Sequence, residues 1–145
     1  MKGWIFRLAN ILGPHLTHGV IFDFIEKLKD NPSTLEILEN GKQKKLYPYV
    51  SYCVNAMIHG FIRPHNAFNI FNIGSQDSIT VDEIAQIISK TMGVHPRFSY
   101  TGGDRGWLGD VPKFKLDITK IKSLGWNPKY SSRDAVEKTA KMLAG

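Results

Sequence analysis

Short apolar segments typical of β-strands alternate along this chain with longer segments typical of amphipathic α-helices. The clearest helix follows Thr80. Thr80 and Glu83 have the spacing of a capping box, an apolar stripe recurs every three to four residues, and Gly93 stands where a left-handed cap ends a helix. Strand-like segments lie on either side of this helix, at 68–73 and 97–100. Such alternation predicts an α/β fold rather than an all-helical or all-β one.

The same two periodicities predict the remaining elements. We expect a buried strand at 4–12, which Gly13-Pro14 ends, and a helix at 19–30. A second helix is expected at 51–62, with an apolar stripe through Val54, Met57, Ile58 and Phe61. Shorter strands are expected at 35–38 and 45–50 around the turn at Asn40-Gly41, and two further helices follow Asp117 and Ser131 or Ser132.

Composition limits the class of protein. The chain has 145 residues, 42% of them hydrophobic, so it can bury one ordinary core but not two full domains. Cys53 is the one cysteine, which favours a reducing, cytoplasmic setting. His15 and His18 lack a nearby third ligand, and no segment approaches membrane-spanning length. We therefore expect a cytoplasmic protein that binds neither a metal nor a membrane.

The net charge of +6 raises the question of an anionic partner, since 19 Lys and Arg outnumber 13 Asp and Glu. The basic residues are scattered except for Lys42, Lys44 and Lys45, and no recognition helix or aromatic RNA-binding signature accompanies them. We therefore expect no nucleic-acid partner. A pyrophosphate-bearing ligand would explain the cluster, and a solvated basic surface is the simpler alternative.

Two motifs carry a family resemblance, Arg7-Leu-Ala-Asn10-Ile-Leu-Gly13-Pro14 and Gly41-Lys-Gln43-Lys-Lys45-Leu-Tyr47-Pro-Tyr49-Val50. They are followed by Phe68-Asn-Ile-Phe-Asn-Ile-Gly-Ser75, and then by Asp117-x-x-Lys120 with Leu124-Gly-Trp126-x-Pro128. In this order the motifs resemble those of the NAD-dependent sugar-nucleotide epimerases and dehydratases of the extended short-chain dehydrogenase/reductase family, the UDP-glucose 4-epimerase-like enzymes above all. The resemblance extends over nearly the whole chain.

The resemblance implies a fold. It makes the chain the C-terminal, substrate-binding part of such an enzyme, with the closing strands and helices of a Rossmann-type domain. Residues 1–14 and 51–75 would belong to that domain, and residues 15–50 and 76–145 to the substrate-binding domain. We expect residues 1–145 to form a single truncated unit.

The dinucleotide-binding half of the family has no counterpart in this sequence. None of the five tyrosines is followed four residues later by lysine, so the family's Tyr-x-x-x-Lys pair is not matched and no catalytic residue is assigned. Gly103, Gly106 and Gly109 match a glycine spacing of the family, but Pro112 follows almost at once and no helical apolar period begins there. Because such a glycine motif binds a dinucleotide only between a strand and a helix, we interpret the match as a coincidence.

The resemblance also implies substrate-binding residues. Asn10, Lys45 and Arg105 match positions near the diphosphate, although the family usually has arginine in place of Lys45, and lysine offers a point charge instead of a bidentate fork. Asn10 lies in the strand expected to be buried, where an unpaired amide would cost about 1–3 kcal/mol. Each assignment has a plain structural alternative, which is a hydrogen bond to a neighbouring loop for Asn10 and either packing or a solvated surface for the others. The full set of expected substrate-binding residues is Asn10, Val20, Phe24, Lys45, Tyr47, Arg105 and Asp110.

The function implied is the substrate-binding portion of an NAD-dependent nucleoside-diphosphate-sugar epimerase or dehydratase, most like UDP-glucose 4-epimerase. In that family NAD takes a hydride from the sugar and returns it. We expect this chain to bind the nucleotide sugar, to bind no NAD by itself, to be inactive alone, and to self-associate or pair with an N-terminal half. A non-catalytic nucleotide-sugar-binding or regulatory module and a basic interaction protein that retains the fold are the alternatives.

Overall fold

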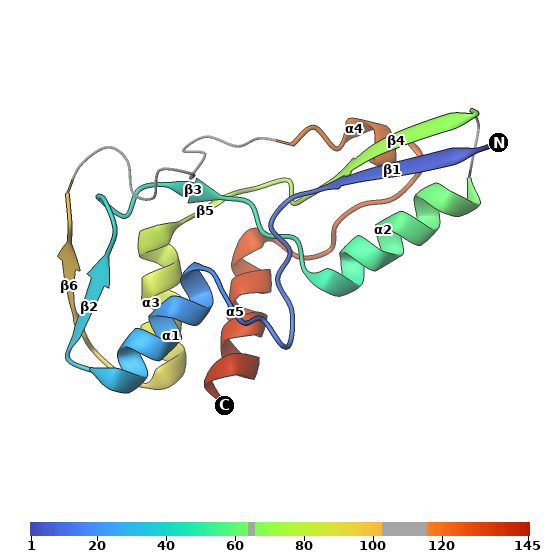
Figure 1. Ribbon diagram of the computed structural model, residues 1–145. Helices are drawn as coiled ribbons and strands as arrows, with labels where there is room; N and C mark the ends of the chain where they lie inside the picture. The colour runs from blue at the N-terminus through green and yellow to red at the C-terminus, as the bar shows by residue number, and fades with distance from the viewer. Residues whose placement is uncertain (64–65, 103–115) are drawn as a thin grey trace.

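The computed structural model describes residues 1–63, 66–102 and 116–145, and it has the α/β architecture that the sequence predicts (Figure 1). Helices and strands alternate through most of the chain, as the change of periodicity indicates. In chain order they are β1 (Gly3–Leu8), α1 (Val20–Asp30), β2 (Thr34–Ile37), β3 (Lys44–Lys45), α2 (Val50–Ile62), β4 (Phe68–Ile73), β5 (Ile79–Thr80), α3 (Val81–Met92), β6 (Arg97–Tyr100), α4 (Thr119–Ser123) and α5 (Ser132–Ala144).

The strands in the described part of the chain form three two-stranded sheets. β1 and β4 are parallel, with Gly3 opposite Phe68 and Leu8 opposite Ile73. β2 and β6 are also parallel, whereas β3 and β5 are antiparallel. Because a parallel pair needs a long crossover connection, residues far apart in the sequence are brought side by side in both parallel sheets.

The larger core lies between three helices and the β2–β6 sheet (Figure 1). α1 presents the apolar stripe that its sequence predicts, and α3 packs against both α1 and α5. The capping boxes of α3 and α5 are both formed, by Thr80 with Glu83 and by Ser131 with Asp134, and Gly93 ends α3 at φ 69°. The residues of α1 buried in this core are Ile21, Phe24, Ile25 and Leu28.

A second cluster joins α2, α4 and the β1–β4 sheet. Gly60 allows the close approach, because a Cβ atom there would lie 3.2 Å from side-chain atoms of both Phe71 and Ile121. Trp126 of the Leu124-Gly-Trp126-x-Pro128 motif is buried in the same cluster, so packing explains a tryptophan at this position. The division of the chain into two domains stays a prediction.

The predicted strand at 4–12 is too long. β1 ends at Leu8, where its partner β4 ends at Ile73, and Ala9 N–H donates the last hydrogen bond to Ile73 O. Leu12 instead forms an isolated parallel bridge with Tyr49. The strand is also only half-buried, because the described residues cover one face of the β1–β4 sheet.

The predicted strand at 45–50 is wrong. β3 consists of Lys44–Lys45 alone and pairs with β5, so the turn at Asn40-Gly41 does not join β2 and β3 into a hairpin. Tertiary contacts decide this path. Val81 N–H donates to Gln43 O and Asp82 N–H to Gly41 O, and both bonds draw the loop to the start of α3.

Helix α2 is apolar on two faces, and the structure buries the one that the sequence analysis did not emphasise. Cys53, Ala56 and Gly60 are buried, whereas Val54, Ile58 and Phe61 are at least half exposed. The period of an apolar stripe does not say which neighbour covers it. No helix of the described residues is both long enough and apolar enough to cross a membrane.

Candidate functional site

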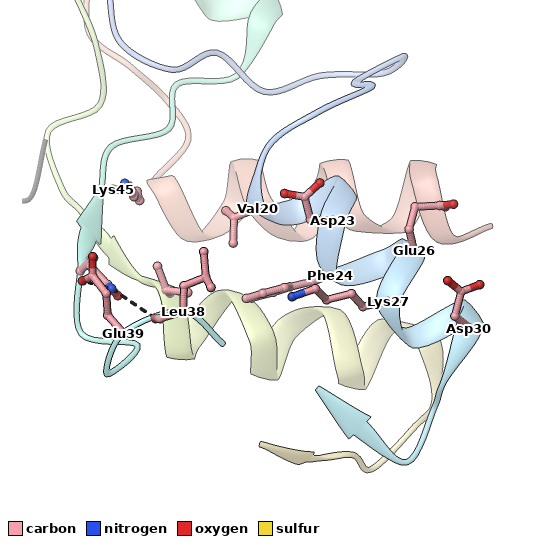
Figure 2. Close-up of a pocket in the computed structure, with 11 residues that line it drawn as sticks. Val20, Asp23, Phe24, Glu26, Lys27, Asp30, Leu38, Glu39 and Lys45 are labelled. Carbon is pink, nitrogen blue, oxygen red and sulfur yellow. Dashed lines mark hydrogen bonds between the residues drawn. The ribbon is translucent and has the colours of Figure 1, made fainter. Parts of the chain in front are cut away.

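Two adjoining pockets lie beside the start of α1, and Val20 lines both. The larger pocket, of about 410 Å³, lies between α1 and the segment that follows β2 (Figure 2). The smaller pocket, of about 210 Å³, lies on the other side of the helix start. The larger is lined by Val20, Asp23, Phe24, Glu26, Lys27, Asp30, Leu38, Glu39, Gln43, Lys45 and Val81, and the smaller by Asn10, Ile11, Leu12, Leu16, His18, Gly19, Val20, Ile21 and Tyr47.

The structure brings five of the seven expected site residues to these two pockets. Val20, Phe24 and Lys45 line the larger pocket, and Asn10, Val20 and Tyr47 line the smaller one. They come from three separate parts of the chain, namely the segment after β1, the first turns of α1, and β3 with the residues after it. The other two expected residues, Arg105 and Asp110, lie outside the described residues, as do the three glycines of the family-like spacing.

Asn10 corrects one step of the sequence reasoning. Its side chain is exposed, because it lies beyond the end of β1 and not within a buried strand. The expected cost of burying an unpaired amide therefore does not apply to it. Asn10 reaches the candidate site as part of the wall of the smaller pocket.

The smaller pocket suits an anionic group. Among the described residues, its lining contains no carboxylate, and it includes Gly19, the N-cap of α1. No side chain caps this helix end, so the first backbone N–H groups and the positive end of the helix dipole lack a side-chain acceptor. An anion placed here would meet backbone N–H donors, although the Asp23 carboxylate belongs to the first turn of the same helix.

The larger pocket, in contrast, has an acidic lining. Among its lining residues, carboxylates outnumber cations. Lys27 pairs with Glu36 at 3.4 Å, outside the lining, so its charge is partly used there. A pocket of this kind disfavours phosphate and favours groups that donate hydrogen bonds. The lining carboxylates are Asp23, Glu26, Asp30 and Glu39 (Figure 2).

The segment that carries Lys45 and Tyr47 is hydrogen-bonded to the start of α5. Tyr47 N–H donates to Ser132 Oγ at 3.1 Å, and Ser132 is fully buried. Ser132 Oγ also lies 2.9 Å from Ser75 Oγ, and Ser132 N–H donates to the Asp77 carboxylate at 2.9 Å. This network fixes the backbone beside both pockets.

Two curated proteins and one crystal structure illustrate what the chain is similar to. It is 29% identical to a candidate UDP-glucose 4-epimerase of Methanocaldococcus jannaschii, covering 96% of this chain and 45% of that protein. It is 32% identical to a UDP-N-acetyl-alpha-D-glucosaminuronate decarboxylase of Bacillus cytotoxicus, covering 93% of this chain and 44% of that protein. The crystal structure of a UDP-galactose 4-epimerase superposes with a TM-score of 0.84 at 38% identity, covering 99% of this chain and 45% of that one.

The chain belongs to the extended short-chain dehydrogenase/reductase family. It spans less than half the length of the curated relatives it matches, which is consistent with the C-terminal part of such a protein. No family model matches the chain. Several solved structures that share the fold contain NAD, in some cases together with a UDP-sugar.

The described part of this family member does not fit NAD. A Rossmann-type site needs a short glycine-rich turn that leads from a parallel strand into a helix. None of the parallel strands β1, β2, β4 and β6 leads directly into a helix through such a turn within the described residues. Those residues also contain no group of three His, Cys, Asp or Glu that could hold a metal.

The sequence analysis selected three of the eleven residues that line the larger pocket, and three of those that it missed show why. Gln43 lies within the quoted motif, so its position was available as a signal. Leu38 was expected only as a strand end, yet it is 49% exposed and faces the pocket near Phe24 (Figure 2). Glu39 gave no signal, because its conformation depends on contacts with Gln43 and with residues 101–102.

Proposed function

We propose that this chain binds the nucleoside diphosphate of a UDP-sugar in the two pockets that meet at Val20. The observation that carries the proposal is that residues chosen from the family resemblance, between positions 10 and 47, converge to line two adjoining pockets. The named relatives supply the ligand class, since their names refer to UDP-glucose, UDP-galactose and a UDP-linked aminouronic acid. On this proposal the chain is the substrate-binding portion of an NAD-dependent epimerase or dehydratase.

Charge suggests how the ligand lies. The diphosphate would occupy the smaller pocket, near Asn10, Tyr47 and the start of α1, because the described residues of its lining include no carboxylate. The nucleoside would enter the larger pocket, which offers apolar side chains and hydrogen-bond acceptors. Lys45 lines the larger pocket, two residues before Tyr47 of the smaller one, and its ammonium group would contact the phosphates as a point charge.

The role of these residues would be binding and orientation. Contacts to the nucleotide, remote from the reacting sugar, can position the sugar and so lower the barrier of a step carried out elsewhere. In the family that step uses NAD, whose nicotinamide accepts and returns a hydride. The described residues offer no site for it, so we propose no catalytic residue in them.

The remainder of the family fold would cover the β1–β4 end of the molecule. Ile5, Phe68 and Ile70 are exposed on one face of this sheet, and Ile58 and Phe61 are exposed on α2. Helix α2 lies beside the sheet (Figure 1). Among the described strands, β1 pairs with β4 alone, which leaves its other edge open. An exposed parallel edge next to apolar side chains is a surface that an N-terminal Rossmann half, or a second copy, would cover.

Calorimetry with UDP tests the proposed function. Lys45→Ala should weaken UDP binding at least about tenfold, because a hydrogen bond to a charged group contributes roughly 1.5–3 kcal/mol. Lys45→Arg should preserve or tighten binding by offering a bidentate fork. We expect a similar loss for Arg105→Ala.

Lys44→Ala is the matched control, because Lys44 is the exposed neighbour of Lys45 in β3 and lies outside both linings. It should bind UDP as the wild type does. A folded wild-type chain that does not bind UDP would refute the proposal. Unchanged affinity in both Lys45→Ala and Arg105→Ala would exclude the proposed phosphate contacts.

A further inference from the structure

Glu39 is a carboxylate buried in the wall of the larger pocket. It is 5% exposed, and its backbone has φ 58°, in the left-handed region that residues other than glycine rarely adopt. Such a conformation persists only where the surroundings enforce it, and it is most often found at functional sites. Glu39 combines this unusual backbone with a charged side chain beside an open pocket.

The backbone of Glu39 is held from both sides. Its N–H donates to Thr101 Oγ1 at 2.9 Å, and Gly102 N–H donates to its carbonyl at 3.1 Å. These bonds form an isolated bridge between the loop after β2 and the end of β6. These backbone bonds fix the position of the Glu39 Cα atom and the direction of its side chain, so the fold places the carboxylate in the pocket wall.

The carboxylate itself has few donors. Gln43 Nε2 donates to it and also lies 3.3 Å from Leu38 O. In the described part of the chain, Gln43 is the one side chain that donates to Glu39. A carboxylate has about four acceptor positions, and a buried charge is tolerated only when donors replace the lost water. One neutral amide leaves most of that capacity for a group that enters the pocket.

We propose that Glu39 accepts a hydrogen bond from the nucleoside of the bound nucleotide, from either an N–H group of the base or a hydroxyl group of the ribose, and thereby selects the nucleotide. This inference rests on the proposed function. A phosphate group cannot be the partner, because it offers no donor and carries the same charge. Val20, Phe24 and Leu38 lie between Glu39 and the carboxylates of α1 and would contact the rest of the nucleoside (Figure 2).

Two variants of Glu39 test the inference by calorimetry on the chain with UDP. Glu39→Gln removes the charge and keeps the shape. Glu39→Gly removes the whole side chain, and it guards against a folding defect, because glycine adopts φ 58° without strain. Both should weaken UDP binding at least about tenfold, as expected when a hydrogen bond to a charged acceptor is lost. Glu137→Gln, which neutralises a carboxylate on α5 outside both linings, should not change it.

Analogues identify the donor. If a ribose hydroxyl is the donor, the wild type should bind 2′-deoxy-UDP or 3′-deoxy-UDP about tenfold more weakly than UDP, and Glu39→Gln should cause little further loss with that analogue. If the base is the donor, 3-methyl-UDP should show this pattern instead. Equal losses caused by Glu39→Gln with all of these ligands would overturn the inference.

The outcomes separate this inference from the proposed function. If the wild type binds UDP and both Glu39 variants bind it equally well, Glu39 is no selector and the proposed function stands. If the folded wild type does not bind UDP, the proposed function fails and the inference fails with it.

Discussion

Gly41 is the residue of the larger pocket's loop that should tolerate substitution least. Its φ is 72°, and a Cβ atom at this position would lie 2.0 Å from Asp82 Oδ1 and 2.6 Å from Asp82 Cγ. Asp82 N–H also donates to Gly41 O at 2.9 Å, so the loop is held against the start of α3. Gly41→Ala therefore introduces two separate penalties, one in the backbone and one in the packing.

Gly93→Ala is a control that has only the first penalty. Gly93 has φ 69°, nearly the same as Gly41, and nothing lies within 4 Å of its added Cβ. Gly93→Ala should lower the free energy of unfolding by about 1–2 kcal/mol, the cost of a left-handed residue with a Cβ atom. Gly41→Ala should cost about 1 kcal/mol more, because the Asp82 carboxylate must turn away and lose its 2.9 Å hydrogen bond from Tyr100 Oη.

Urea unfolding followed by tryptophan fluorescence measures both changes, and a double-mutant cycle assigns the difference. In an Asp82→Ala background the overlap is gone, so Gly41→Ala should cost no more than Gly93→Ala does. Equal costs of the two substitutions in the wild type would refute the steric argument. So would a cost of Gly41→Ala that is the same with and without the Asp82 side chain.

Four further predictions concern stability, cysteine reactivity and association. Thr80→Ala and Ser131→Ala should each cost about 1 kcal/mol in urea unfolding by removing a helix cap. Backbone and side-chain hydrogen bonds from Thr80 lower the pKa of Glu83. The ionised Glu83 therefore stabilises the folded chain above the ordinary carboxyl pKa, and this stabilisation should be lost as pH falls through the folded-state value. An acid titration of Thr80→Ala should show a smaller loss of stability. Burial raises the pKa of Cys53 to about 11, so iodoacetamide near neutral pH should label it only as the chain unfolds, and rapid labelling of the native chain would contradict this. Ile58→Glu with Phe61→Glu should reduce self-association in light scattering without lowering Tm, and unchanged association would exclude the exposed α2 face as its cause.

The sequence predicted the elements whose stabilising contacts are local. α3 follows from a capping box, a stripe and a glycine cap that all lie within one segment, and the structure confirms each of them. α1 likewise buries most of the predicted stripe. β4 also has the predicted bounds, 68–73, although it pairs with the distant strand β1. Helix capping and helical apolar stripes involve residues three or four positions apart, so both can be recognised in a short stretch of sequence.

Tertiary structure decided what depends on distant partners. β1 ends where β4 ends, β3 pairs with β5 and not with β2, and α2 buries its small residues because β4 and α4 approach closely at Gly60. A periodic pattern does not name the neighbour that will cover it.

The candidate site divides in the same way. The family resemblance selected Asn10, Lys45 and Tyr47 within motifs and Val20 and Phe24 at matching positions between them, and the fold brought all five to adjoining pockets. Glu39 could not be selected in this way, because its left-handed backbone is imposed by Thr101 and Gly102, more than sixty residues away in the chain. The sequence therefore determined the helices and the residue types of the site, whereas contacts between distant segments decided which side chains share a pocket and which carboxylate is buried in its wall.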